Sequence, residues 1–192
     1  LFNNDYFGDG RDRWRTGSYV FSYVTGPQTY DGNPQGFGDV REYRLRGEII
    51  APQNRSTNDR PYVGALSAGV HTHFGTGPLQ YSLGADVVFV GPQTGLASFQ
   101  DAFHDAFGLR EPALNNQMPD EVFVNGAATA TYRYALSETV SLRPFVEATA
   151  GVEDMVRVGG DVLIGPVGQH DLMLRDVATG QLYRGTNDGA SG

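Results

Sequence analysis

The sequence of 192 residues contains no cysteine and no lysine, and it has a single tryptophan. The absence of cysteine excludes both a disulfide framework and a thiolate metal site. Because there is no lysine, all 14 positive charges are arginines, and the 22 acidic residues give a net charge of −8. This balance argues against a nucleic-acid partner, which requires a basic surface.

Long hydrophobic runs are also absent, and none approaches the ~20 residues of a membrane-spanning helix. No signal-peptide pattern is present, and the chain opens at Leu1 rather than at a methionine. We therefore expect a mature chain or an excised fragment.

Glycine (26 residues), tyrosine (10) and phenylalanine (11) are abundant, which favours a protein of strands and turns. Alternation of apolar and polar residues predicts a sequence of strands. They are expected at 1–7 (the end of a first strand), 17–25, 42–51, 62–74, 79–89, 122–135, 140–153 and 155–165, with a weak ninth within 171–183. We expect one β domain over residues 1–185 and a disordered tail over 186–192.

Two kinds of antiparallel sheet account for this alternation. A soluble sandwich buries its apolar faces, whereas a transmembrane barrel turns them toward lipid and keeps its polar faces in the lumen. The predicted strands of about 10–14 residues are longer than usual in soluble sheets and long enough to cross a bilayer. Aromatic residues also lie near the strand ends on the apolar faces, as in an interfacial girdle: Tyr19, Tyr81, Phe89, Tyr132 and Tyr134. We predict an all-β, antiparallel up-and-down transmembrane barrel, with the soluble sandwich as the alternative.

Residues 91–108 are the one stretch with helical periodicity. An apolar stripe recurs at spacings of three and four, and Gly108 is a suitable end for the helix; the stripe consists of Leu96, Phe99, Phe103 and Phe107. Gln100 and His104 share a different face. His104 could act as a general base or a ligand at a barrel rim, or it could be an ordinary polar-face histidine, which spacing alone favours.

In an up-and-down barrel, alternate connections lie at the same rim. The connections after the first, third and fifth strands therefore share one rim, where Asp5, Arg60 and His104 can converge. Asp5, preceded by Asn4, offers oxygen ligands for a hard cation such as Ca²⁺. His71 and His73 are expected to face the lumen, but two histidines without a third ligand make a poor metal site.

Four segments occur in an order that resembles the outer-membrane lipid A 3′-O-deacylase family, the LpxR-like proteins. They are Asn4-Asp5 followed by Arg13-x-x-Thr16-Gly17, then Asp59-Arg60-Pro61-Tyr62-Val63-Gly64, Gln100-x-x-x-His104-Asp105 and Asn116-Gln117. The resemblance implies a twelve-stranded barrel in the bacterial outer membrane. It also implies Ca²⁺-dependent hydrolysis of the 3′-acyloxyacyl ester of lipid A, with the protein acting as a monomer on lipopolysaccharide.

The same resemblance implies roles for individual residues. His104 matches the base that activates water, and Thr16 and Gln100 match polar active-site positions. Asp5 with Asn4 matches the calcium-binding pair.

Glu111 is the nearest candidate for a carboxylate that follows the histidine in the family. The family's lysine near the start of the fourth strand has no counterpart, because the chain has no lysine. Arg60 or Arg55 is expected in its place, although a guanidinium differs from an ammonium in size and donor geometry.

We expect eight or nine strands in this chain, whereas the family has twelve. The difference predicts that the chain is truncated at its C-terminus. Two other functions stay open at this point. One is a non-catalytic outer-membrane barrel or lipid-binding protein of the same fold, and the other is a soluble β-sandwich binding module.

Overall fold

A computed structural model describes residues 1–4, 14–27, 32, 36–52, 60–109, 114, 116–166 and 171–185. The described chain is antiparallel β-structure with one α-helix and one short 3₁₀ helix. The strands are β1 (Phe2–Asn4), β2 (Trp14–Thr25), β3 (Val40–Ala51), β4 (Val63–Thr76), β5 (Leu79–Val90), β6 (Glu121–Tyr132), β7 (Tyr134–Ala135), β8 (Val140–Ala150), β9 (Met155–Ile164), β10 (Met173–Arg175) and β11 (Leu182–Arg184). None of the described helices is both long enough and apolar enough to cross a membrane.

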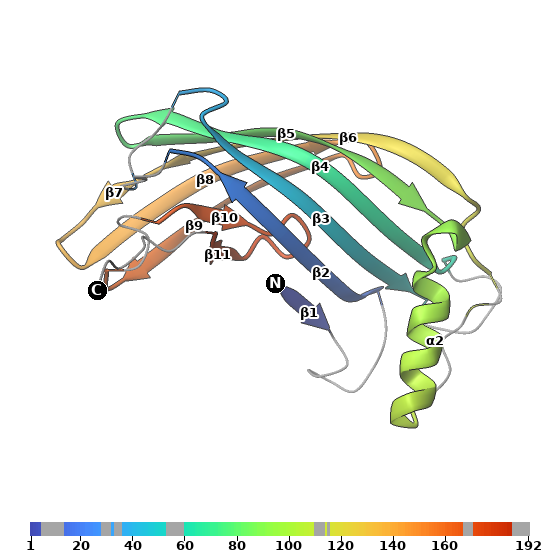
Figure 1. The fold of residues 1–192 in the computed structure, drawn as a ribbon. Coiled ribbons are helices and arrows are strands. Elements are labelled where there is room, and N and C mark those ends of the chain that lie inside the picture. The colour runs from blue at the N-terminus through green and yellow to red at the C-terminus, as the bar shows by residue number, and fades with distance from the viewer. Residues whose placement is uncertain are drawn as a thin grey trace. The chain divides into compact units, whose positions relative to one another are not determined.

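The main sheet follows the order of the sequence. Its strands pair in the order β1-β2-β3-β4-β5-β6-β8-β7, and β9 pairs with the remaining edge of β8 (Figure 1). This arrangement confirms the predicted up-and-down topology. β7 continues β6 in one register, since Thr131 lies opposite Phe145 and Tyr134 opposite Leu142. The predicted single strand over 122–135 is thus interrupted at Arg133, which this register places opposite Arg143 of β8 and whose N–H donates to the Pro78 carbonyl at 2.9 Å.

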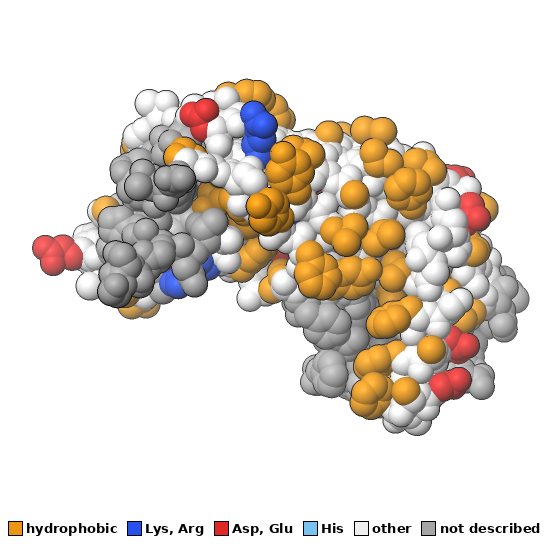
Figure 2. Space-filling view, viewed as in Figure 1, with side chains coloured by type: hydrophobic (Ala, Val, Ile, Leu, Met, Phe, Trp, Pro, Cys, Tyr) orange, Lys and Arg blue, Asp and Glu red, His pale blue; other side chains and the backbone are white. Residues whose placement is uncertain are grey.

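Burial along the strands decides between the two kinds of sheet. On β3, Tyr43 and Leu45 are 44% and 43% exposed, whereas the alternating Glu42 and Arg44 are 0% and 8% exposed. Apolar side chains of β5, β6 and β9 are likewise exposed, and hydrophobic side chains cover much of the surface visible in Figure 2. A soluble sandwich would bury the opposite faces, so that alternative is wrong, and the pattern is that of a barrel wall.

The helical prediction for 91–108 is confirmed in two parts. The 3₁₀ helix η1 covers Pro92–Thr94, and the helix α2 covers Leu96–Phe107. Gly108 ends α2 in a left-handed conformation (φ 63°) that favours glycine, and the following N–H of Leu109 donates to the His104 carbonyl at 2.8 Å.

The C-terminal part of the described chain differs from the prediction of one weak ninth strand. β10 and β11 form a separate two-stranded sheet, with Leu174 opposite Tyr183. Leu172 and Leu174 are buried with Val40, and Val24 packs against them. Because Val40 belongs to β3, the hairpin adds an apolar contact to the inward side of that strand. The expected tail over 186–192 lies outside the described residues.

Contacts divide the chain into two compact units. Unit 1 contains residues 1–21, 45–68 and 87–123, and unit 2 contains 22–44, 69–86 and 124–192. The strand ends that flank the β1–β2, β3–β4 and β5–β6 connections all belong to unit 1. This grouping agrees with the prediction that these three connections share a rim. The single domain predicted over residues 1–185 stays a prediction.

Glycines in unit 2 lie under large side chains on the neighbouring strand. A Cβ added at Gly84 of β5 would collide with the His71 ring of β4, and one added at Gly69 would collide with the Asp86 carboxylate. The same relation joins β8 and β9, where a Cβ at Gly159 would come within 2.8 Å of the Phe145 ring. The inward side chains can therefore lie flat across the adjacent strand.

Candidate functional site

Helix α2 buries a polar face and exposes an aromatic one. Leu96, Gln100 and His104 are its buried residues, with Gln100 and His104 only 6% and 5% exposed. They follow one another at intervals of four residues, which places them on one side of the helix. The predicted pairing of Gln100 and His104 on one face is confirmed, and that face packs against the rest of unit 1. The predicted stripe is wrong at Leu96, which lies on this buried face and not with the exposed Phe99, Phe103 and Phe107.

Gln100 carries an unusual buried group. Its side-chain oxygen Oε1 has no hydrogen-bond partner among the described residues. Leaving a buried amide oxygen without a donor costs roughly 1–3 kcal/mol. Such an oxygen, one turn before a buried histidine, is suited to accept a hydrogen bond from a substrate or to face a cation.

The start of α2 is held by the Arg60–Gly64 segment. A Cβ added at Gly64 would lie 2.8 Å from Thr94 Oγ1 and 3.1 Å from Leu96 Cβ, so β4 and the helix approach closely there. Gly64 also accepts a 3.0 Å hydrogen bond from the Gly91 N–H. A residue without a side chain is therefore required for the helix to reach this position.

The neighbouring Tyr62 joins a further segment to the same place. Its N–H donates to the Asn116 carbonyl at 2.7 Å, and its own carbonyl accepts from the Met118 N–H at 2.9 Å. Within unit 1, the segments at 60–64 and 116–117 thus meet through Tyr62, and the helix that carries residues 100–105 begins against Gly64.

Replacing Gly64 by alanine should loosen the helix. We expect Gly64→Ala to lower the free energy of unfolding by about 1–3 kcal/mol, because the added methyl group overpacks the contact with Thr94 and Leu96. Denaturant unfolding measures this change. Gly126→Ala is the matched control, since a Cβ at that strand glycine meets nothing within 4 Å. Equal stability of the two variants would contradict the proposed contact.

The other predicted site residues are described only in part. In the β1–β2 ladder, Asn4 lies opposite Gly17, the residue after Thr16, so the backbones of Asn4 and Thr16 are neighbours. Their side chains, and the whole of Asp5, Glu111 and Arg55, lie outside the described residues.

The position of Arg60 is described. Its side chain is exposed, unlike those of Gln100 and His104. The Arg60 guanidinium could therefore reach a substrate at the buried face of α2 only from the solvent side.

Unit 2 holds a second polar cluster, which sequence reasoning did not assemble. Glu42 is fully buried and accepts hydrogen bonds from Ser22 Oγ at 2.5 Å and from Arg44 Nε and Nη2 at 2.9 and 2.8 Å. Its Oε2 is also 3.0 Å from His73 Nε2. One carboxylate thereby joins residues from β2, β3 and β4.

His71 makes a separate pair with Asp86, whose Oδ1 is 3.2 Å from His71 Nε2. The two histidines thus bind different carboxylates. Among the described residues, no group of three or more histidine or acidic side chains is placed to hold a metal ion. The expectation that His71 and His73 make a poor metal site stays a prediction.

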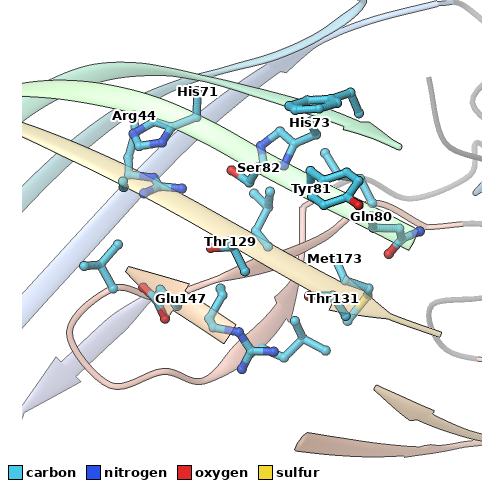
Figure 3. Close-up of a pocket in the computed structure, with 17 residues that line it drawn as sticks. Arg44, His71, His73, Gln80, Tyr81, Ser82, Thr129, Thr131, Glu147 and Met173 are labelled. Carbon is cyan, nitrogen blue, oxygen red and sulfur yellow. The ribbon is translucent and has the colours of Figure 1, made fainter. Parts of the chain in front are cut away.

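The hairpin of unit 2 is tied to the strands by arginines. Arg157 donates to Glu147 at 3.1 Å and to the Val177 carbonyl at 3.0 Å, and Arg175 pairs with Asp161 and lies over the Phe145 ring. Arg175, Glu147 and Val177 also line a pocket, together with Arg44, His71, His73, Ser82 and Thr129 (Figure 3). The arginines that line it, Arg44 and Arg175, are already paired with carboxylates.

Tyr183 of the hairpin contacts the same polar face. Its hydroxyl is 3.4 Å from Ser22 Oγ, and burial raises the pKa of this hydroxyl above its ordinary value.

Comparison with known proteins was made for the whole chain. A family model described as "Outer membrane protein LpxR" matches residues 1–166. Among solved structures, LpxR from Salmonella typhimurium matches with a TM-score of 0.68 at 20% sequence identity. The match covers 84% of this chain and 60% of that protein, so the chain spans about three fifths of its length. No curated protein matches the sequence.

Proposed function

The chain belongs to the outer membrane protein LpxR family, and on this premise we propose that it is an enzyme that modifies lipid A. Family membership gives an outer-membrane location and the β-barrel fold. The proposed reaction is hydrolysis of the 3′-acyloxyacyl ester of lipid A, with the protein acting as a monomer on lipopolysaccharide. The observation that carries the proposal is the buried face of α2, which presents His104 and Gln100 together.

His104 serves as the general base in this proposal. An imidazole nitrogen accepts a proton from a water molecule while the water oxygen attacks the ester carbonyl carbon. The same nitrogen returns the proton to the leaving alkoxide oxygen when the tetrahedral intermediate collapses. The products are a free fatty acid derivative and the lipid hydroxyl, and no covalent enzyme intermediate is required.

The other helix-face and rim residues position the ester and the base. Gln100, with its buried and unpartnered oxygen, orients the water or a substrate hydroxyl, and Thr16 adds a second polar contact. Glu111 holds the imidazole in the required orientation. Arg60 takes the place of the family's lysine as a donor to the developing oxyanion.

Calcium is part of the proposal, held by Asp5 with Asn4. The oxygen donors of these two residues suit a hard cation, as does the unpartnered Gln100 oxygen. When bound, Ca²⁺ would supply Lewis-acid polarisation of the ester carbonyl.

Removal of calcium is expected to abolish the reaction. We expect EDTA to eliminate loss of the 3′-acyloxyacyl group from lipid A, added Ca²⁺ to restore it, and Asp5→Ala to reproduce the effect of EDTA. Mass spectrometry of lipid A after incubation with the protein measures each of these. Activity that persists in EDTA would contradict the metal role.

A non-catalytic barrel of the same fold is the second candidate. It is favoured by the absence of lysine and by the exposure of Arg60, because both leave the oxyanion donor in question. An unchanged lipid A profile in the presence of Ca²⁺ and folded wild-type protein would support this candidate over the enzyme.

A further inference from the structure

The exposed side of α2 carries a row of aromatic rings. Phe99, Phe103 and Phe107 are 61%, 37% and 67% exposed, although each is large and apolar. Their rings are neighbours along the helix, with centroids 6.5 Å apart for Phe99 and Phe103 and 4.6 Å apart for Phe103 and Phe107. They therefore form one continuous apolar ridge rather than isolated surface residues.

The charged side chains of the helix lie away from this ridge. At about 100° per residue, Asp101 and Asp105 are each roughly 160° around the helix from Phe103. Small residues, Ala102 and Ala106, occupy the arc between. The helix thus has an aromatic side, an acidic side and a buried side that carries His104, which is the pattern of a helix lying in a membrane interface.

The chain itself indicates what covers the ridge. In unit 1, the strands next to α2 in sequence expose apolar side chains on their outward faces, including Val87 and Phe89 of β5 and Val122 of β6. In an outer-membrane barrel these outward faces contact acyl chains. The ridge lies in the connection between β5 and β6, after the short helix η1, so in the chain it stands next to these outward apolar faces.

We propose that α2 inserts Phe99, Phe103 and Phe107 into the acyl layer of the outer membrane and is anchored there. The anchor fixes the depth of the helix relative to the membrane surface and thereby the depth of His104, which projects from the adjacent side. The proposal rests on the family's outer-membrane location and does not depend on the proposed reaction. The aromatic rings bind bulk lipid and not a particular lipid head group.

A fluorescence experiment tests the anchor without any measurement of activity. The chain has one tryptophan, so Trp14→Phe provides a background in which a tryptophan can be placed on the ridge by Phe103→Trp. The protein is refolded into phosphatidylcholine vesicles with and without bromine on the acyl chains. We expect a blue-shifted emission that brominated lipid quenches by roughly twofold, because an interfacial helix buries its apolar face ~5–10 Å into the membrane.

Ser98→Trp in the same background is the matched control. Ser98 is exposed on α2 and lies roughly 140° around the helix from Phe103, so its emission should stay red-shifted and unquenched. Phe107→Trp is the second probe if the first variant does not refold, and heat-modifiable gel migration identifies folded protein. Red-shifted, unquenched emission from a folded ridge variant would overturn the proposal. Quenching without lipid A hydrolysis would support the anchor and count against the enzyme.

Discussion

Replacing His104 by alanine should reduce lipid A hydrolysis by roughly 10²–10⁴-fold, the contribution typical of a positioned general base. His104 is buried on the side of α2 that also carries Gln100, and the variant removes the proposed general base. The helix should persist, because alanine is the strongest helix former and the packed residue Leu96 is unchanged. Mass spectrometry of lipid A over time gives the rate.

Two comparisons make this result specific. Ser98→Ala, on the exposed side of the same helix, should retain the wild-type rate. His104→Ala protein should also show wild-type heat-modifiable migration, which reports the folded barrel. Equal lipid A profiles for wild-type and His104→Ala proteins would refute the enzyme and favour the non-catalytic barrel.

The largest effect on stability is expected at Glu42. Glu42→Ala should lower the free energy of unfolding by about 3–5 kcal/mol, because it leaves the buried Arg44 guanidinium without its bidentate partner. The same change removes the acceptor for Ser22 and the partner of His73. Denaturant unfolding of the protein in detergent micelles measures the difference.

The double variant Glu42→Leu/Arg44→Met separates two costs. One is the cost of leaving the buried Arg44 guanidinium unpaired, and the other is the loss of the Glu42–Arg44 ion pair itself. Replacing both charges by apolar groups removes the unpaired guanidinium, so the loss should be smaller than for Glu42→Ala alone. Glu121→Ala, at an exposed position at the start of β6, is the control for simple loss of a carboxylate. If Glu42→Ala is as stable as Glu121→Ala, the buried Glu42–Arg44 pair contributes nothing to the free energy of unfolding.

The extents of the long strands could be predicted from the sequence, because alternation with a period of two persists over ten or more residues. The alternation does not say which face is buried. On β3 the same pattern of Glu42, Tyr43, Arg44 and Leu45 fits a sandwich or a barrel, and only the burial of the charged residues distinguishes them. For the short β10–β11 hairpin the sequence predicts only one weak strand, since three-residue strands are too short to show a period.

The helix face could be predicted for a simple reason. Gln100 and His104 are four residues apart in one element, so local geometry determines their relation. The Glu42–His73 pair joins strands β3 and β4, and its members are 31 residues apart. Alternation of apolar and polar residues predicts that His73 faces the lumen, but pairing it with Glu42 also requires the register of β3 against β4, which alternation alone does not give.

The glycines under large side chains imply that some positions of this sheet cannot change one at a time. A larger residue at Gly84 is tolerated only if His71 becomes smaller or turns away, and the same holds for Gly159 with Phe145. At Gly69 a Cβ would also come within 2.4 Å of the Ala85 carbonyl oxygen, so a smaller residue at position 86 would not make room there. Evolution of these strands should therefore proceed by paired exchanges of size across neighbouring strands. In homologous sequences, we expect a bulky residue at one member of each pair to accompany a small residue at the other.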